Sequence, residues 1–174
     1  MPASLPPPAT IRRAQPSEAA LLTDLALAAK AHWGYSPAFM SAARAELTIS
    51  ACSITEHDVH VAILPNDAEI AGVYRLTPGD IGELSYLWIR PAHIGRGLGR
   101  LLWEDALRRA AAGGMVRLTL DADPNAEGFY LRMGAQRCGE TPSKSVEGRR
   151  LPLLTVDVHQ ALAMMRERES KAAA

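Results

Sequence analysis

The fold of this chain is decided by residues 87–100, which read Leu-Trp-Ile-Arg-Pro-Ala-His-Ile-Gly-Arg-Gly-Leu-Gly-Arg. An apolar run ends at Ile89, Pro91 interrupts it, and glycines alternate with other residues between positions 95 and 99. The leucine-, alanine- and arginine-rich segment that follows predicts a helix. Glycine lets the backbone approach an anion closely, and a helix start points unpaired N–H groups at it. The stretch predicts a phosphate-binding loop between strand and helix, and a plain glycine turn is the alternative.

Two common nucleotide motifs fail on spacing. A P-loop needs Gly-Lys followed by serine or threonine, whereas Gly99 is followed by Arg100 and a leucine. The dinucleotide pattern Gly-x-Gly-x-x-Gly would start at Gly95 and needs glycine at position 100, which is arginine. The pattern Arg/Gln-x-x-Gly-x-Gly/Ala remains, and residues 94–99 fit its glycines but carry Ile94 at its first position. On these residues the chain resembles the GNAT family, the acetyl-CoA-dependent N-acetyltransferases.

The composition predicts one folded domain without a bulk charge. The chain has 174 residues, 48% of them hydrophobic, which is enough for one domain with a sizeable core. We expect that domain to cover residues 10–174, after a flexible proline-rich arm at residues 1–9. Basic and acidic residues number 19 each, so no net field attracts nucleic acid or an anionic membrane.

The small number of cysteines and the lack of a recognisable targeting signal predict where the protein is located. Cys52 and Cys138 are too few for a disulfide framework and lack metal-ligand spacing, so we expect reduced thiols and no metal. The N-terminus lacks the basic and apolar regions of a signal peptide, and no apolar run approaches the roughly 20 residues of a membrane span. These features predict a soluble cytoplasmic protein.

Hydrophobic periodicity and turn residues divide the chain into helices and strands. Ser17 and Ser36 are the predicted N-caps of the first two helices, and two glycines after residue 112 end the third. The predicted strands are residues 10–14, 58–64, 69–76, 81–89, 116–121, 135–139 and 151–158. The predicted helices are residues 17–30, 36–47, 98–112, 124–133 and 160–170. We expect a turn at residues 65–67, a loop through Cys52 and Ser53, and a polar loop at residues 141–150.

The connections between these elements predict the sheet. Short turns join the three strands between residues 58 and 89, which predicts antiparallel neighbours. A helix connects the strands at 81–89 and 116–121, which predicts a parallel pair. The order of elements resembles that of the GNAT family over nearly the whole chain. The resemblance implies an α/β fold with a single mixed, mostly antiparallel sheet of about six to seven strands flanked by helices, whose parallel pair splays apart at the cofactor site.

The resemblance implies acetyl-CoA as the co-substrate. The backbone of Leu87 and Ile89 would hydrogen-bond the pantetheine arm, and the N–H groups of residues 94–99 would hold the diphosphate. Arg96 and Arg100 would supply the charge that the isoleucine at the first motif position lacks. The predicted cofactor-binding residues are Leu87, Trp88, Ile89, Ile94, Gly95, Arg96, Gly97, Leu98, Gly99, Arg100, Asn125 and Tyr130.

A second motif lies at residues 123–135, which read Asp-Pro-Asn-Ala-Glu-Gly-Phe-Tyr-Leu-Arg-Met-Gly-Ala. It resembles a GNAT segment in its asparagine, its Phe-Tyr pair and its second glycine, and departs from that segment at Gly128 and Ala135. The resemblance implies that Asn125 caps a helix and touches the pantetheine arm. It also implies that Tyr130 is the general acid for the leaving thiolate, whose pKa is about 8.5. Packing as a helix aromatic is the alternative for Tyr130.

A base is needed because the attacking amine must be neutral, and a lysine-like amine has a pKa near 10.4. Glu83 is the candidate, since its spacing from Ile94 is that of the catalytic glutamate in family members that acetylate lysine. Glu83 and Ser85 share a face of the predicted strand, because side chains alternate along it. The alternative is an exposed strand residue, with a water chain as the base. Trp88 on the same strand is either a cofactor contact or a core residue.

The acceptor site is predicted at the break between the first two helices, where residues 30–35 read Lys-Ala-His-Trp-Gly-Tyr. This stretch resembles a signature of one bacterial GNAT subgroup. Its aromatic rings would flank an amine, and a packed helix corner is the alternative. Ser143, Ser145 and Arg149 could bind a carboxylate, and a solvated surface loop is the alternative there. The predicted substrate-binding residues are His32, Trp33, Tyr35, Glu83, Ser85, Ser145 and Arg149.

The sequence as a whole predicts an acyltransferase of the GNAT family. We expect it to move acetyl from acetyl-CoA to a primary amine of a small molecule, such as an amino acid or another carboxylated amine, by direct attack. Two alternatives stay open: an acetyltransferase acting on a protein N-terminus or lysine, and a non-catalytic module that binds acetyl-CoA for regulation. We expect no nucleic-acid or membrane partner, and a homodimer is left open.

Overall fold

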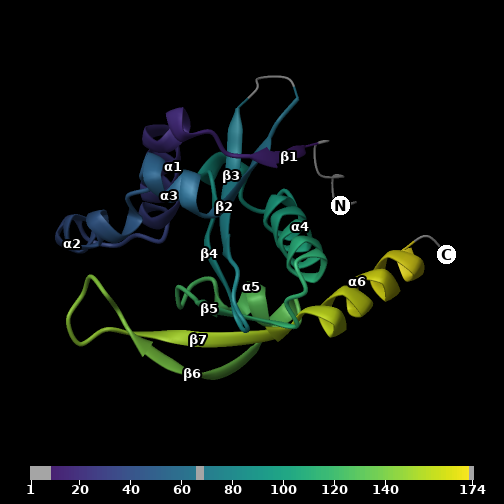
Figure 1. Ribbon diagram of the computed structural model, residues 1–174. Helices are drawn as coiled ribbons and strands as arrows, with labels where there is room; N and C mark the ends of the chain where they lie inside the picture. The colour runs from purple at the N-terminus through teal and green to yellow at the C-terminus, as the bar shows by residue number, and fades with distance from the viewer. Residues whose placement is uncertain (1–8, 66–68, 173–174) are drawn as a thin grey trace. The chain divides into compact units, whose positions relative to one another are not determined.

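Seven strands form one mixed sheet, as the sequence predicted. They are β1 (Thr10–Arg13), β2 (Asp58–Ile63), β3 (Ile70–Thr77), β4 (Gly82–Ile89), β5 (Arg117–Asp121), β6 (Gln136–Pro142) and β7 (Arg150–Asp157). The strand order is β1-β2-β3-β4-β5-β7-β6 (Figure 1). β1 and β2 are antiparallel, β4 and β5 are parallel, and β7 is antiparallel to both β5 and β6.

The computed structural model describes residues 9–65 and 69–172. Residues 1–8 of the predicted arm, and Asn66 and Asp67 of the predicted turn, lie outside the described residues.

The chain forms two compact units. The first holds the described residues up to Arg75, Tyr86–Trp103 and Lys144–Glu147, and the second holds Leu76–Ser85, Glu104–Ser143 and the described residues from Gly148 onward. Strand β4 and helix α4 (Leu98–Ala112) each continue from one unit into the other. Helix α4 has the predicted bounds, and Gly114 ends it with a φ of 76°.

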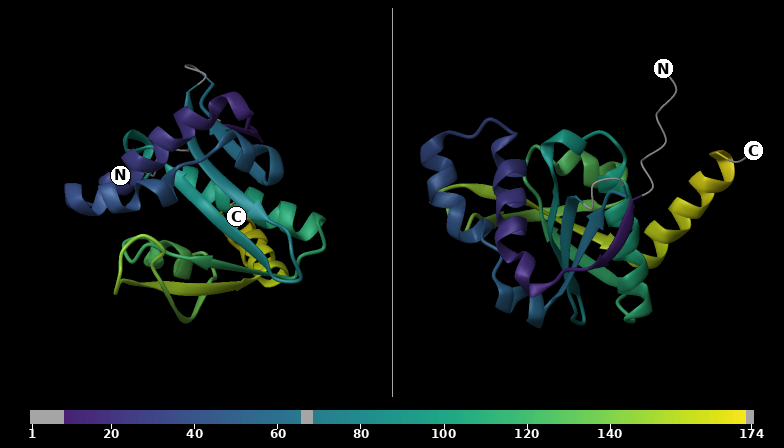
Figure 2. Two further views of the ribbon diagram at one scale, coloured as in Figure 1. Left: turned by 60° about the vertical axis from the view of Figure 1, so that its left-hand side comes forward. Right: turned by 90° about the horizontal axis from the view of Figure 1, so that it is seen from above.

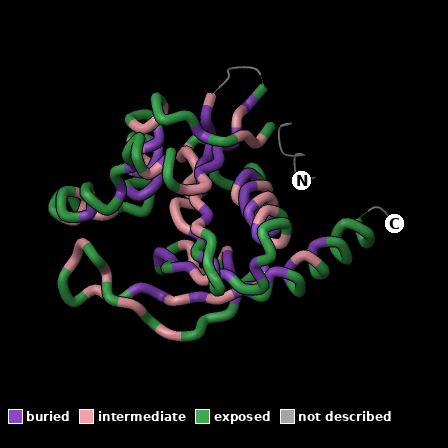
Figure 3. Tube along the Cα trace, viewed as in Figure 1, coloured by how far each residue is buried: buried purple, intermediate pink, exposed green. Residues whose placement is uncertain are grey.

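Three helices belong to the first unit: α1 (Ala19–Ala31), α2 (Pro37–Leu47) and α3 (Ala51–Glu56). Figures 1 and 2 show them together beside β2. Their apolar faces meet β2 and β3 in one buried cluster, and Figure 3 shows buried positions where helices and strands meet. The cluster includes Leu22, Leu25, Ala43, Ile54, Val59, Val61 and Val73.

The start of the first helix differs from the prediction. Pro16–Glu18 form a 3-10 turn, and α1 begins at Ala19, so Ser17 is not an N-cap. The Glu18 carboxylate takes the place of the expected serine cap. It accepts the N–H of Gln15 at 2.8 Å, which satisfies a donor at the start of the turn. Helix α1 ends one residue after the predicted Lys30.

Serine hydroxyls begin the next two helices. Ser36 caps α2 as predicted, its hydroxyl accepting the N–H of Phe39 at 3.2 Å. The predicted loop through Cys52 is wrong, because Ser50 accepts the N–H of Ser53 at 3.0 Å and starts α3 there.

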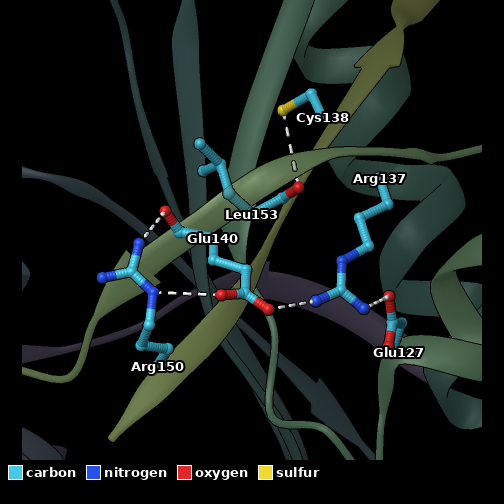
Figure 4. Close-up of polar contacts among 6 residues, drawn as sticks. All are labelled: Glu127, Arg137, Cys138, Glu140, Arg150 and Leu153. Carbon is cyan, nitrogen blue, oxygen red and sulfur yellow. Dashed lines mark hydrogen bonds and ion pairs between the residues drawn. The ribbon is translucent and has the colours of Figure 1, made fainter. Parts of the chain in front are cut away.

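The second unit contains the β6–β7 hairpin and the short helix α5 (Glu127–Arg132). Arg137 on β6 bridges Glu127 of α5 at 3.2 Å and Glu140 at 2.8 Å, and Arg150 on β7 contacts Glu140 at 3.0 Å (Figure 4). This network ties α5, which carries Tyr130, to the hairpin. Cys138 lies beside it, with its thiol donating to the Leu153 carbonyl at 3.4 Å.

The C-terminal helix α6 (Val158–Ala172) begins two residues before the prediction. The Val158 N–H donates to the Val116 carbonyl at 3.0 Å, and the Asp157 side chain accepts the N–H of Gln160 at 2.8 Å. The strand predicted to start at Val116 starts one residue later, and Val116 is 56% exposed.

Candidate functional site

The glycine loop between β4 and α4 has the geometry of an anion site. Gly95 and Gly97 have φ angles of 79° and 84°, in the left-handed region that side-chain-bearing residues rarely adopt. The Gly97 carbonyl accepts the N–H of Leu101 at 3.1 Å, which closes the first turn of α4. The N–H groups at Gly97, Leu98 and Gly99 therefore precede any helical acceptor and point from the positive end of the helix dipole.

Not every amide of the loop is equally placed for a ligand. The Ile94 N–H donates to the Pro91 carbonyl at 3.2 Å, and the Arg96 N–H donates to the His93 carbonyl at 3.4 Å. These bonds fix the loop and leave the later amides, nearer the helix, as the stronger candidates for an anion.

Side chains around the loop form a polar chain in the first unit. His93 Nδ1 lies 3.1 Å from Arg96 Nη1, and His93 Nε2 lies 3.2 Å from Glu69 Oε2. The other oxygen of Glu69 lies 2.9 Å from Arg90 Nε. No site role was predicted for His93, because Glu69 precedes it by 24 positions and no local pattern connects the two.

Strand β4 bends where it passes from one unit to the other. Tyr86 has a φ of 59°, the one positive φ among the described residues other than glycine. Arg75 holds it, with its guanidinium carbon 4.1 Å from the ring centroid and its Nη1 donating to the hydroxyl at 3.1 Å. Such conformations are unfavourable by about 1–3 kcal/mol and gather at functional sites. Pairing of β4 with β5 covers Gly82 and Glu83, ahead of the bend.

Lys30 lies in an aromatic cluster in the first unit. Its Nζ is 5.0 Å from the Tyr35 ring, 5.6 Å from Phe39 and 5.8 Å from Trp88, and the residue is 7% exposed. Tyr35 and Phe39 are stacked with ring centroids 4.1 Å apart. Tyr35 therefore lies against the buried ammonium of Lys30.

The other aromatic residues of the predicted acceptor site differ in exposure. Trp33 is 38% exposed and meets His32 edge-on at 5.4 Å between centroids. Trp88 packs against the apolar cluster of the first unit, as its core reading predicted. Its Nε1 is buried and has no hydrogen-bond partner within the described part of the chain.

Tyr130 lies on α5 in the second unit and is buried. Burial raises the pKa of its hydroxyl, and the negative charge of Asp123 raises it further. Asp123 has a side chain only 4% exposed, and its Oδ2 lies 3.6 Å from Arg149 Nη2. The sequence had assigned Asp123 no role; its partner Arg149 lies on a distant loop, so spacing gave no signal.

Asn125 does not cap α5, so that prediction is wrong. The residue before the helix is Ala126, and no side chain caps it. The backbone N–H and the Nδ2 of Asn125 both donate to Asp123 Oδ1 at 2.9 Å. Residues 124–126 form a turn, so the helix starts later than Pro124, and a carboxylate organises its approach.

The remaining predicted residues lie on β4 and the β6–β7 loop. Glu83 is exposed and faces Thr119 in the β4–β5 register, and Ser85 is half-buried. The Ser143 N–H donates to the Arg149 carbonyl at 2.7 Å, which closes the base of the loop. Ser145 belongs to the first unit and Arg149 to the second.

Within residues 9–65 and 69–172, no group of three or more histidine, cysteine, aspartate or glutamate side chains could hold a metal. No helix in the same residues is both long and apolar enough to pass through a bilayer.

A profile described as an acetyltransferase (GNAT) domain matches residues 37–150, which include the glycine loop and Tyr130. This chain belongs to the GNAT acetyltransferase family. The resemblance read from the glycine loop and from α5 is thereby confirmed at the level of the family. No curated protein matched the sequence of this GNAT acetyltransferase.

Solved GNAT structures share the fold at low identity. A GCN5-related N-acetyltransferase from Rhodopseudomonas palustris is 22% identical, with 90% of this chain and 98% of that chain covered and a TM-score of 0.74. The PaiA N-acetyltransferase of Thermoplasma acidophilum, in complex with coenzyme A, is 17% identical over 86% and 98% of the chains, with a TM-score of 0.70. YncA of Salmonella typhimurium, a putative acetyltransferase with acetyl-CoA, is 21% identical over 86% and 94%, with a TM-score of 0.58.

Proposed function

We propose that this GNAT domain transfers acetyl from acetyl-CoA to the primary amine of a small molecule by direct attack. The loop before α4 carries the proposal. Its two left-handed glycines expose successive amides at a helix N-terminus, which suits a diphosphate. The coenzyme A in PaiA and the acetyl-CoA in YncA, two proteins of the same fold, support that ligand.

The cofactor residues then take distinct parts. The N–H groups of residues 97–99 hold the diphosphate, and Arg96 and Arg100 supply positive charge in place of the arginine or glutamine that Ile94 replaces. Beyond the bend at Tyr86, the backbone of Leu87 and Ile89 is assigned to the amide groups of the pantetheine arm. Trp88 supports this strand from the core, and Asn125 is a further contact to the arm.

Glu83 is assigned to accept the proton of the attacking amine, directly or through water. Its exposure on β4 lets this carboxylate pass a proton on to solvent. The neutral amine attacks the thioester carbonyl, the tetrahedral intermediate collapses, and the carbon–sulfur bond breaks to give an amide and CoA.

Tyr130 is assigned to the leaving sulfur as a hydrogen-bond donor. A thiolate with a pKa of about 8.5 is a weaker base than a tyrosinate, whose ordinary pKa of about 10 is here raised by burial and by Asp123. Complete proton transfer from Tyr130 would therefore be uphill. Because burial and Asp123 disfavour tyrosinate, the hydroxyl can stabilise the developing thiolate by a hydrogen bond without giving up its proton.

We assign binding of the acceptor amine to residues at the break between the first two helices, on β4 and on the loop between β6 and β7. His32, Trp33 and Tyr35 provide the aromatic side, and membership of the subgroup with the 30–35 signature remains part of this proposal. A carboxylate on the amine would suit Arg149, because a planar guanidinium with five N–H donors matches the geometry of a carboxylate. Ser85 and Ser145 are assigned as further polar contacts.

An assay of free-thiol release tests this function. The protein is incubated with acetyl-CoA and a panel of amines that includes free amino acids, their carboxamides and simple alkylamines. We expect release above the spontaneous rate with some amines, and lower KM for an amino acid than for its carboxamide. Saturable acetyl-CoA binding without release on any amine would favour a regulatory module, and release only with peptides would favour a protein acceptor.

A further inference from the structure

His93 has both ring nitrogens engaged, and its two partners select its tautomer. The residue is 8% exposed. A guanidinium only donates hydrogen bonds, so the Nδ1 that lies 3.1 Å from Arg96 must accept. The hydrogen of the neutral ring then sits on Nε2, which donates to Glu69 at 3.2 Å. The contacts thus select one tautomer, with a lone pair aimed at Arg96.

The far side of this ring is firmly anchored. Glu69 also contacts Arg90 Nε at 2.9 Å, and the same Nε donates to the Ile70 carbonyl at 3.2 Å. A carboxylate held on one oxygen by Arg90 and on the other by His93 fixes the plane of the imidazole. The chain of contacts runs from the start of β3, through the 3-10 turn Pro91–His93, to the glycine loop.

Arg96 is the side chain that the anchored imidazole restrains. It is exposed, and a long exposed arginine loses about 1–2 kcal/mol of side-chain entropy when a ligand immobilises it. The bond to His93 uses one of its five N–H donors and restrains the guanidinium before any ligand arrives. Such restraint matters here, because the first position of the loop motif is the uncharged Ile94.

We propose that His93 is a positioning residue for the cofactor: its Nδ1 lone pair holds the Arg96 guanidinium where it contacts the diphosphate of acetyl-CoA. This inference rests on the proposed function. It assigns to a buried histidine, outside the catalytic residues, the task of holding Arg96, whose charge replaces the one missing at position 94.

Two amide substitutions of His93 separate this role from mere packing. In His93→Asn the amide oxygen lies near the place of Nδ1 and can still accept from Arg96. In His93→Gln the amide lies near the place of Nε2, where it can donate to Glu69 but leaves Arg96 without its acceptor. The dissociation constant of acetyl-CoA is measured by isothermal titration calorimetry for both, for Arg96→Ala, and for the His93→Gln/Arg96→Ala double variant, with thermal melts as a check of folding.

We expect His93→Asn to bind within about twofold of the wild type, and His93→Gln and Arg96→Ala each to bind about 5- to 10-fold more weakly. The double variant should bind no more weakly than Arg96→Ala, since both changes remove the same contact. With S-acetylpantetheine, which has no diphosphate, kcat/KM should be the same for His93→Gln and the wild type.

Several results would overturn the inference while leaving the proposed function intact. Equal weakening by His93→Asn and His93→Gln would mean that the ring only supports the fold. Full affinity in Arg96→Ala, or additive losses in the double variant, would mean that His93 does not act through Arg96. Failure of the wild type to bind acetyl-CoA would instead refute the proposed function, and this inference with it.

Discussion

Tyr130 was predicted from the sequence as a site residue, but its burial changes the chemistry that its hydroxyl can perform. Its position in the motif pointed to a proton donor, but only the structure reveals the neighbouring carboxylate of Asp123 and the loss of solvent. Both disfavour tyrosinate and raise the pKa of the hydroxyl above its ordinary value. The chemistry assigned to Tyr130 is therefore stabilisation of charge on sulfur, in place of proton transfer.

Replacing Tyr130 by phenylalanine tests that assignment. We expect kcat to fall by at least about tenfold while the dissociation constant of acetyl-CoA is unchanged, because the lost contact strengthens only as sulfur becomes negative. Tyr74→Phe is the matched control, since Tyr74 is also buried but lies on β3 outside the proposed site. Steady-state kinetics and calorimetry supply the two readouts. Unchanged turnover in Tyr130→Phe would remove the residue from the mechanism.

The residues of the candidate site that could not be predicted from the sequence share one property. His93 and Asp123 act through partners far along the chain, at Glu69 and Arg149, so neither belongs to a local pattern. Asn125 was misassigned for a related reason: an asparagine before a helix suggests a cap, yet its amide donates to Asp123. Residue types and spacing indicate chemistry, but a hydrogen-bond partner is a property of the fold.

Close packing at Gly72 decides how the elements around the loop fit together. A Cβ at this position would lie 2.8 Å from Leu102 Cδ1 of α4, 2.9 Å from Ile89 Cδ1 and 3.2 Å from the Trp88 carbonyl. The glycine thus allows α4 and the end of β4 to approach β3. Both side chains could turn away, but the main-chain contact could not be relieved without moving β4.

We expect Gly72→Ala to lower the free energy of unfolding by about 1–3 kcal/mol through overpacking. It should also raise the KM for acetyl-CoA, since the strand that moves carries Leu87 and Ile89. Gly139→Ala is the control, because no heavy atom lies within 4 Å of a Cβ there, and its effect should stay within about 0.5 kcal/mol. Urea unfolding measures both. Equal stability of the two variants would show that the sheet yields easily at Gly72.

The start of α1 carries a pH-dependent contribution to stability. Hydrogen bonding to Arg12, at 3.1 Å, lowers the pKa of Glu18 below its ordinary 4.5, with burial opposing the shift and the Gln15 N–H aiding it. A carboxyl whose folded-state pKa is lowered stabilises the fold fully above the unfolded pKa. The contribution is lost as the pH falls from there through the lower folded-state pKa.

Glu18→Gln should therefore lower the free energy of unfolding by about 1 kcal/mol at pH 7 and by much less at pH 3. Glu46→Gln, at an exposed position of α2, controls for the removal of one negative charge. Denaturant titrations at the two pH values measure the difference. A pH-independent gap between wild type and Glu18→Gln would mean that the carboxylate is not the stabilising form.

Helix prediction succeeded where the periodic pattern was long and failed for helices too short to show such a pattern. Helix α4 has fifteen residues of periodic sequence and a glycine stop, and its bounds were predicted from these alone. Helices α3 and α5 have six residues each, too few for a periodic signal, so the first was missed and the second was placed too early.

For the whole molecule, the order of elements was enough to predict one mixed sheet of the GNAT type. The sequence could not place β7 between β5 and β6, because a hairpin can lie on either side of its neighbour and the choice is made by long-range pairing. Nor could it predict the bend at Tyr86, since a tyrosine gives no sign of a positive φ.

A stoichiometric measurement of both products shows whether this protein transfers acetyl to an amine. The protein is incubated with acetyl-CoA and the best amine of the panel, and free CoA and acetylated amine are quantified together over time, with amine-free and protein-free controls. We predict equal amounts of CoA and N-acetyl product, formed only when protein and amine are both present. Release of CoA without the acetylated amine, or no release by a protein that binds acetyl-CoA, would contradict the account.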